Sequence, residues 1–201
     1  MNNVFLHVGC GPQNKSRLRG FNAGRWREIR FDIDPTVKPD LVGSLADMSS
    51  VPNEGVDAIF SSHNIEHLHH HEHPAAFQEF LRVLKPGGFV VLTCPDLQSV
   101  CEYVARDTLL DPLYTSPAGP IAPLDIIYGH QAAIKGGNHF MAHRSGFTLR
   151  TLKEQIISNG FANCHAIRRP AAYDLWVIAF KDPTSETAMR DKAAEFFPDS
   201  I

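Results

Sequence analysis

The sequence predicts an α/β protein built around a mostly parallel β-sheet. Short runs rich in β-branched and aromatic residues alternate with helical stretches through the first half of the 201 residues, which is typical of strand-crossover-strand units. Two further strand-like runs near the C-terminus are close enough in sequence to form an antiparallel pair. Hydrophobic types make up 43% of the chain and charged types 20%, so the chain can bury one sizeable core.

The first half contains five expected strands. They are the apolar runs at residues 4–8, 28–32, 40–42, 57–61 and 89–94. A helix is expected at residues 74–84, because apolar side chains recur there at helical spacing, Pro74 suits the first turn and Lys85-Pro86-Gly87-Gly88 ends it. The turn after the first strand is also expected to lead into a helix.

An insertion is expected in the second half. Four prolines and a glycine between residues 107 and 123 argue for an ordered loop or short turns. Long ordered loops in compact domains are usually functional lids or binding segments. We therefore expect residues 107–147 to form an insertion that acts as a lid within one domain spanning residues 1–181.

The remaining elements complete the expected sheet. A helix is predicted at residues 148–158, and strands at residues 162–168 and 173–181 are predicted to pair in antiparallel fashion. The sheet then has seven strands. The polar tail at residues 182–201 has a weak helical stretch near Glu186 to Phe197 and is expected to pack on the surface or fray.

Charge and composition exclude several classes of protein. The formal net charge is -3, which provides no excess positive field for a nucleic-acid backbone. The longest apolar runs are far below the roughly 20 residues that span a bilayer, and the first residues do not resemble a signal peptide. The four cysteines stand far apart, so neither a zinc knuckle nor a disulfide framework is indicated. We expect a cytoplasmic protein whose partner is a small-molecule substrate, and the oligomeric state stays open.

A glycine loop and a later acid indicate a nucleoside-containing ligand. Gly9 and Gly11 follow the first strand directly, where glycines allow a sharp turn and close approach of a ligand. Asp32 ends the second strand 21 residues after Gly11, near the offset at which an acid binds ribose hydroxyls. Asn14 occupies the place of the third glycine of the dinucleotide fingerprint, so a cofactor without bridging phosphates fits better. The competing interpretation is a simple tight turn with solvated loop acids.

Several motifs together resemble the class I S-adenosylmethionine-dependent methyltransferases, and specifically small bacterial methyltransferase-11-type proteins. The resemblance covers Val4 to Val100 and is weaker through His143 to Thr148 and Asn159 to Phe161. Its carriers are Leu6-His7-Val8-Gly9-Cys10-Gly11, Phe31-Asp32-Ile33-Asp34-Pro35, Val56-Asp57-Ala58-Ile59-Phe60-Ser61-Ser62-His63-Asn64-Ile65-Glu66-His67-Leu68, Leu81-Arg82-Val83-Leu84-Lys85-Pro86-Gly87-Gly88 and Cys94-Pro95-Asp96. It implies a Rossmann-like doubly wound mixed seven-stranded sheet with an antiparallel last strand, and S-adenosylmethionine as cofactor.

The resemblance also implies a set of cofactor contacts. The glycine loop would pack under the methionine portion, Asp32 would bind the ribose, residues 44–48 would cover the adenine, and the end of the fourth strand would lie near the methyl group. The expected cofactor-binding residues are His7, Gly9, Cys10, Gly11, Asp32, Ile33, Ser44, Leu45, Asp47, Ser62 and His63. Many relatives carry an acid in place of His7 and an aspartate in place of Ser44, so backbone carbonyls near Gly9 and the side chain of Asp47 are expected to replace those contacts.

Histidines are concentrated between residues 63 and 73. If the chain is helical from Ile65, then His63, Glu66 and His67 share one face, a spacing suited to a metal. Relatives use this Glu-His-Leu sequence to start a helix, and a solvated loop explains the other histidines, so we expect no required metal. His139 and His143 form a second pair that either faces the substrate or lies on the surface.

The expected activity is transfer of a methyl group to an unidentified small-molecule acceptor. Alignment of donor and acceptor is the main requirement, with a general base needed only if the acceptor must lose a proton. The candidate catalytic residues are His63, Asp96, His139 and His143. Two alternatives remain, an NAD(P)-dependent reductase or epimerase, disfavoured by the missing third glycine, and a non-catalytic cofactor- or metal-binding protein.

Overall fold

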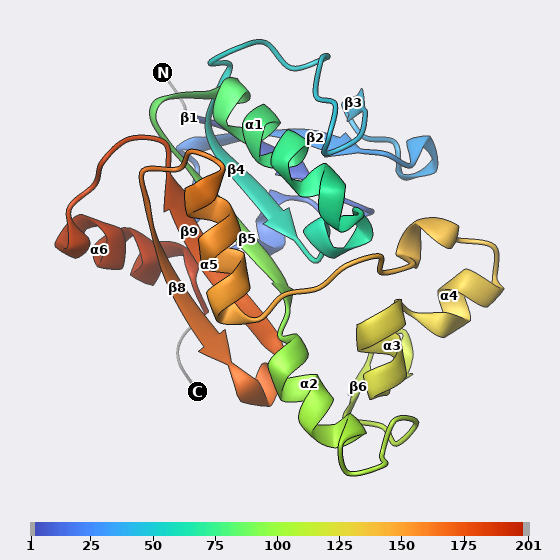
Figure 1. Cartoon of the computed structure of the whole chain (residues 1–201). Helices are drawn as coiled ribbons and strands as arrows, with labels where there is room; N and C mark the ends of the chain where they lie inside the picture. Colours follow the sequence, from blue (N-terminus) through green and yellow to red (C-terminus); the bar gives the residue numbers. More distant parts are fainter. Residues whose placement is uncertain (1–2, 199–201) are drawn as a thin grey trace.

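A computed structural model describes residues 3–198 and contains one seven-stranded mixed sheet (Figure 1). The strand order is β3-β2-β1-β4-β5-β9-β8. The strands are β1 (Asn3–Val8), β2 (Trp26–Asp32), β3 (Leu41–Val42), β4 (Val56–Ser62), β5 (Leu84–Pro95), β8 (Asn163–Arg169) and β9 (Asp174–Phe180). The predicted fold class and all seven predicted strands are confirmed.

Parallel pairing brings the carboxyl ends of the first strands to one edge of the sheet. β1 lies between β2 and β4 and runs parallel to both, with Leu6 opposite Ile29 and Ile59. β9 runs antiparallel to β5 on one side and to β8 on the other, as the sequence predicts. Ligands of open α/β sheets bind outside the carboxyl ends of the parallel strands, so this edge is where a site is expected.

One face of the sheet is covered by two helices, α1 (His73–Val83) and α5 (Leu149–Ser158), which lie toward the viewer in Figure 1. Pro74 occupies the first turn of α1, and Thr148 caps α5 by accepting a hydrogen bond from the Thr151 backbone N–H. Both predicted helices are confirmed. Residues 85–88 form the beginning of β5 rather than a separate turn, because Leu84 is already extended where α1 ends.

The other face of the sheet lacks the helix that was expected after the glycine loop. Residues 9–25 form a loop whose only regular element is a single 3-10 turn, Lys15–Arg17, capped by the side chain of Asn14. Pro12, Gly20 and Gly24 interrupt this segment, which therefore cannot maintain a long helix. Phe21 covers this face of the sheet instead. It is fully buried and its ring packs against those of Phe5 and Trp26.

The C-terminal helix α6 (Glu186–Phe196) completes the cover of that face. Ala193, Phe196 and Phe197 are buried in the same cluster as Phe21. Phe196 lies so close to Gly20 that a Cβ at residue 20 would overlap its ring. The helical stretch expected near Glu186 to Phe197 is confirmed, whereas the expectation of a surface or frayed tail is wrong there, because the aromatic residues at the helix end replace the side chains of the missing helix.

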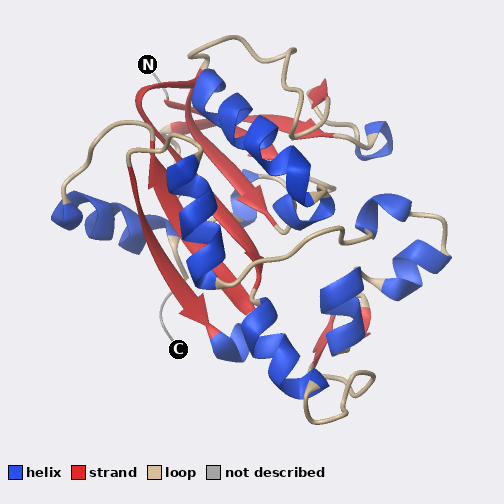
Figure 2. Cartoon of the chain, in the orientation of Figure 1, coloured by secondary structure: helices blue, strands red, loops and turns tan. Residues whose placement is uncertain are grey.

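The insertion forms short elements beyond the carboxyl edge of the sheet (Figure 2). α2 (Leu97–Val104) leads into it, and its own elements are the hairpin β6 (Tyr114–Ser116) and β7 (Gly119–Ile121), α3 (Pro123–Tyr128) and α4 (Gln131–Lys135). A small core of their own, with Val100, Ile121 and Ile126 buried, holds them together. Short turns were expected here, whereas α2 and the hairpin were not. None of the helices within residues 3–198 is long and apolar enough to cross a membrane.

Removal of the Phe196 side chain should destabilise the whole domain, because that ring is 2% exposed and lies between the sheet and the 9–25 loop. We expect Phe196→Ala to lower the free energy of unfolding by about 3–5 kcal/mol in urea denaturation. Asp191→Ala, at an exposed position of the same helix, should change it by less than about 0.5 kcal/mol. Equal effects of the two substitutions would show that α6 is not part of the core.

Candidate active site

The glycine loop turns at the carboxyl end of β1. Gly9 and Gly11 both have positive φ, at 63° and 51°, a conformation that favours glycine. A Cβ at Gly9 would overlap the side chain of Asn64, whereas a Cβ at Gly11 would meet no atom within 4 Å. Gly9 therefore allows close packing against the loop after β4, and Gly11 leaves an open approach to the backbone.

Asp32, at the end of β2, connects two loops at this edge. It is 8% exposed. Its Oδ2 accepts a hydrogen bond from the Gly11 backbone N–H at 2.7 Å, and its Oδ1 accepts one from the Asp34 N–H at 2.9 Å. An ionised carboxylate has about four lone-pair sites, so Asp32 can still accept further hydrogen bonds from a ligand.

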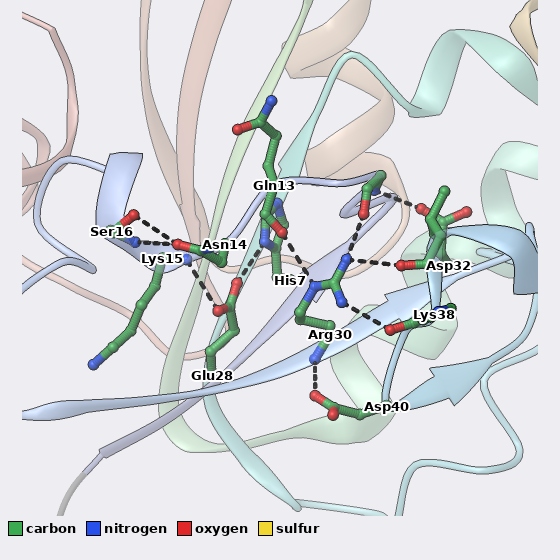
Figure 3. Close-up of polar contacts among 12 residues, drawn as sticks. His7, Gln13, Asn14, Lys15, Ser16, Glu28, Arg30, Asp32, Lys38 and Asp40 are labelled. Carbon is green, nitrogen blue, oxygen red and sulfur yellow. Dashed lines mark hydrogen bonds and ion pairs between the residues drawn. The ribbon is translucent and has the colours of Figure 1, made fainter.

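Arg30 holds the glycine loop from below, as Figure 3 shows. Its guanidinium donates to the carbonyls of Gly11 at 2.5 Å, Gln13 at 3.1 Å and Lys38 at 2.8 Å, while its backbone N–H donates to Asp40 Oδ2 at 2.7 Å. These bonds join the loops after β1 and β2. Sequence reasoning missed Arg30, because its partners are backbone carbonyls that no motif displays.

The side chain of His7 points to the face of the sheet opposite the one on which Leu6 and Val8 are buried. Its Nδ1 lies 2.7 Å from Glu28 Oε1, and Glu28 Oε2 accepts a hydrogen bond from the Lys15 backbone N–H at 3.0 Å (Figure 3). Burial lowers the pKa of His7, despite the opposing influence of Glu28. Side chains alternate between the faces of a strand, and Leu6 and Val8 belong to the other core. His7 therefore supports the glycine loop from behind.

A cavity of about 370 Å³ opens beside the glycine loop and Asp32. Seven of the expected cofactor residues line it, namely Gly9, Gly11, Asp32, Ile33, Ser44, Leu45 and His63. The other four, His7, Cys10, Asp47 and Ser62, do not line it. The Cys10 thiol is buried, which raises its pKa to about 11, and Asp47 is exposed and accepts a hydrogen bond from the Ser49 N–H at 3.1 Å.

Part of the insertion closes the far side of this cavity. The lining residues there are Asn138, Phe140, Met141 and Arg144. The chain is held in place because the backbone N–H groups of Arg144 and Ser145 both donate to the Glu66 carbonyl, at 2.9 and 3.1 Å. The sequence predicted a lid here, with His139 and His143 as its candidate catalytic residues. His139 is exposed and does not line the cavity.

A second cavity, of about 380 Å³, lies near the start of β2 and is lined by Trp26, Gly88 and Lys192 among others. Residues at that position belong to the amino ends of the strands. Because ligands of this sheet type bind at the carboxyl ends, we take the cavity beside Asp32 as the candidate site.

Histidines surround a buried carboxylate beside the cavity, and two of them, His63 and His67, line it. Glu66 is 1% exposed, and His63 Nδ1 lies 3.6 Å from its Oε1, too far for a hydrogen bond. Burial opposes ionisation of Glu66, but His63, His67 and His143 outweigh it and lower the pKa of the carboxyl group. Burial lowers the pKa of His143. Desolvation also lowers the pKa of His63, but the Glu66 carboxylate outweighs this and raises it.

The four expected catalytic residues separate into different environments. His63 lines the cavity, with a backbone φ of 48° that is unusual for a residue other than glycine. Asp96 is fully buried, caps α2, and accepts hydrogen bonds from Ser99 Oγ and Arg168 Nε, both at 2.5 Å. Its carboxylate therefore holds α2 against β8. His143 belongs to the Glu66 cluster and not to the cavity lining.

The part of the chain that builds this edge matches a known family. A family model described as a methyltransferase domain matches residues 6–92. That range contains β1, β2 and β4 together with the glycine loop and Asp32. Over this range the chain is similar to the methyltransferase-11 family of class I S-adenosylmethionine-dependent methyltransferases. The resemblance found in the sequence is thereby confirmed.

Solved structures show the same fold. A SAM-dependent methyltransferase from Methanosarcina mazei is 15% identical, with a TM-score of 0.59 over 90% of this chain and 92% of that one. The 1,6-didemethyltoxoflavin-N1-methyltransferase from Burkholderia thailandensis, solved with 1,6-didemethyltoxoflavin and S-adenosylhomocysteine bound, is 14% identical, with a TM-score of 0.56 over 90% and 72%. A SAM-dependent methyltransferase from Archaeoglobus fulgidus is 15% identical, with a TM-score of 0.53 over 90% and 86%.

The candidate site fits S-adenosylmethionine as a cofactor. S-adenosylmethionine carries a ribose with free hydroxyls and no bridging phosphates. Asp32 offers a nearly buried carboxylate at the cavity wall, and the missing Cβ of Gly11 leaves the loop backbone open to a ligand. The observed loop has a single 3-10 turn instead of a helix N-terminus, so it lacks the usual phosphate-binding feature. These features match a nucleoside cofactor without phosphates.

Loss of the Asp32 carboxylate should weaken cofactor binding. We expect Asp32→Ala to lower the affinity for S-adenosylhomocysteine at least tenfold in calorimetry, because hydrogen bonds to a charged group contribute about 1.5–3 kcal/mol each. Asp47→Ala is the matched control, since Asp47 lies outside the cavity lining, and it should change affinity less than about threefold. Unchanged binding by folded Asp32→Ala protein would contradict the role of Asp32.

Proposed function

We propose that the protein transfers the methyl group of S-adenosylmethionine to a small-molecule acceptor bound beneath the insertion. The observation that carries this proposal is the single cavity that runs from Asp32 and the glycine loop to Phe140 and Arg144. Its volume of about 370 Å³ lies within the range of small-molecule sites. A negative net charge and the absence of a basic excess further support a small acceptor over a nucleic acid.

The residues that line the cavity divide between donor and acceptor. Asp32 would accept hydrogen bonds from the ribose hydroxyls, Ile33, Ser44 and Leu45 would contact the adenine, and the backbone at Gly9 and Gly11 would support the methionine portion. When bound, S-adenosylmethionine supplies an electrophilic methyl group. His7 and Cys10 contribute by fixing the glycine loop from the opposite side, through the Glu28 contact and through burial respectively.

Catalysis then depends mainly on alignment. When donor and acceptor are bound in line, the entropy cost of bringing them into the reactive geometry is met by binding and not in the transition state. The contacts of Asp32, Arg30 and Asn64 with the glycine loop would hold the donor in that geometry. His63 is the one of the four candidate bases that lines the cavity. It is therefore our candidate to accept a proton where the acceptor must lose one. Asp96 serves a structural role.

The insertion would act as the lid over the acceptor. Its residues Asn138, Phe140, Met141 and Arg144 line the cavity. Gly137 has a φ of 96° and precedes this stretch, so it is a position where the backbone can bend. Phe140 is 50% exposed and would cover the acceptor when the lid closes. Lids of this kind exclude water from reacting groups.

The experiment that tests the proposal is a transfer screen. Purified protein is incubated with S-adenosylmethionine that carries a labelled methyl group and with fractionated metabolite pools, and products are identified by mass. We expect a labelled small molecule whose formation requires the protein. Tighter binding of NADH than of S-adenosylhomocysteine, or label appearing only in nucleic acid, would contradict the proposal.

Phe140 should affect the acceptor without affecting the donor. Once the screen has identified an acceptor, Phe140→Ala should raise its KM roughly fivefold, equivalent to about 1 kcal/mol of lost apolar contact. Affinity for S-adenosylhomocysteine should change less than about threefold. Leu110→Ala, an exposed apolar residue of the same insertion outside the cavity lining, is the control. A KM change as large for Leu110→Ala as for Phe140→Ala would contradict the lid assignment.

A further inference from the structure

Glu66 is a buried carboxylate without a compensating hydrogen bond. Its side chain lies in the 3-10 turn Ile65–His67 directly after β4, and it is 1% exposed. Neither Oε1 nor Oε2 has a hydrogen-bond partner among residues 3–198. Buried carboxylates are normally paired, hydrogen-bonded or coordinated to a metal. The side chain thus has unused capacity to bind a cation.

Two histidines bring nitrogen atoms to the same place. One ligand atom from each of Glu66, His67 and His143 can be chosen so that all three lie within 4.8 Å of one another. The rings of His67 and His143 meet edge to face, with centroids 4.8 Å apart. Ligand atoms of a tetrahedral zinc site lie roughly 3.4 Å apart, given bond lengths of about 2.1 Å. The three side chains would have to move closer together to bind such an ion.

Backbone carbonyls fix the tautomers of both rings. His67 Nδ1 lies 3.1 Å from the Ala142 carbonyl oxygen, and His143 Nδ1 lies 2.8 Å from the Ile126 carbonyl oxygen. A carbonyl can only accept, so in each ring Nδ1 carries the hydrogen and donates it. In a neutral imidazole the free lone pair is then on Nε2. Metal-ligating histidines typically hold their second nitrogen this way, with a backbone carbonyl or carboxylate as partner.

The insertion completes this group of residues. Glu66 and His67 follow β4, whereas His143 comes from the end of the insertion, about 75 positions later in the chain. The two hydrogen bonds from the Arg144 and Ser145 N–H groups to the Glu66 carbonyl hold the segments together. His67 also lines the cavity. A cation held here would therefore border the acceptor end of that cavity.

We propose that Glu66, His67 and His143 form a binding site for a divalent first-row transition metal such as Zn²⁺. Two imidazoles and one carboxylate are a typical ligand set for such ions, and this set leaves coordination positions open. Oxygen-preferring Mg²⁺ and Ca²⁺ are poorly matched to two nitrogen ligands. The sequence pattern grouped His63 with Glu66 and His67 and led us to expect no required metal. In the structure His143 takes the place of His63 in this group, and the buried Glu66 carboxylate has no hydrogen-bond partner among residues 3–198.

If the proposed methyl transfer also holds, the open positions give the metal a role in acceptor choice. An acceptor with an ionisable oxygen or thiol could bind the cation through that atom and lose its proton more readily. This extension rests on the proposed function. The metal site itself does not, because its binding can be measured without any acceptor.

The test is metal binding by the full chain. Protein stripped with a chelator and dialysed is titrated with Zn²⁺ by calorimetry, and Co²⁺ is added separately to record its visible absorption bands. We expect one tight equivalent of Zn²⁺ per chain and a tetrahedral or five-coordinate Co²⁺ spectrum. Glu66→Gln, His67→Asn and His143→Ala should each lower Zn²⁺ affinity at least tenfold.

Exposed histidines provide the matched control. His69 and His71 are exposed, lie in the same segment and stack on each other with centroids 5.6 Å apart. The double variant His69→Asn and His71→Ala should keep Zn²⁺ affinity within about threefold. Loss of binding in this double variant, with retention in His143→Ala, would assign the metal to the surface and overturn the proposal. Absence of a stoichiometric site in the wild-type chain would overturn it as well.

Thermal unfolding separates a binding defect from a folding defect. Saturating Zn²⁺ should raise the Tm of the wild-type chain by linkage, and it should not raise the Tm of Glu66→Gln. Metal-free Glu66→Gln should still unfold cooperatively, because glutamine fills the same space as glutamate and has no hydrogen-bond partner to lose there. An equal Zn²⁺-dependent rise in both proteins would exclude Glu66 as a ligand. The Zn²⁺ measurements do not depend on the transfer screen, because they measure metal binding and unfolding and not methyl transfer.

Discussion

The hydrogen bond between the Asp32 carboxylate and the Gly11 N–H is the interaction on which the cofactor site depends. It joins the end of β2 to the loop after β1, two segments that the parallel register already brings to one edge. Arg30 adds a second connection between the same loops from the side away from the cavity. These polar bonds set the shape of the cavity wall before any ligand binds.

The same loop determines how the domain is closed on its other face. The chain after this loop carries Gly20 and Gly24, which disfavour a long helix, and the sheet face beneath it would be left open. Phe21 and the C-terminal Phe196 fill that space together. The site and the tail are therefore coupled through packing, since displacement of α6 would remove the support behind the glycine loop.

The sequence was most informative where a feature is local. Strand runs, the helix at α1, and the combination of Gly9, Gly11 and Asp32 are visible in short stretches, and the structure places those three residues on one cavity. His7 was misplaced, although the alternation of side chains along β1 predicts that it points away from the cavity.

Arg30 and His143 could not be identified from the sequence, because only the fold brings them close to their partners. Arg30 donates to the Gly11 carbonyl, and His143 lies beside Glu66, which is 77 positions earlier in the chain. The helix-forming tail was underestimated because its amphipathic pattern is weak, and the aromatic residues that anchor it lie at its very end.

The buried carboxylate also connects the site to the movement of the insertion. The carbonyl of Glu66 holds the N–H groups of Arg144 and Ser145, while its side chain lies beside His143 on the same segment. Any opening that separates these backbone groups also removes His143 from Glu66. Because binding linkage is reciprocal, an ion that bridges the two segments favours the closed insertion to the same degree that closure favours the ion. The histidines around Glu66 favour its ionised form, and one of them, His143, lies on the segment that closes the insertion over the cavity.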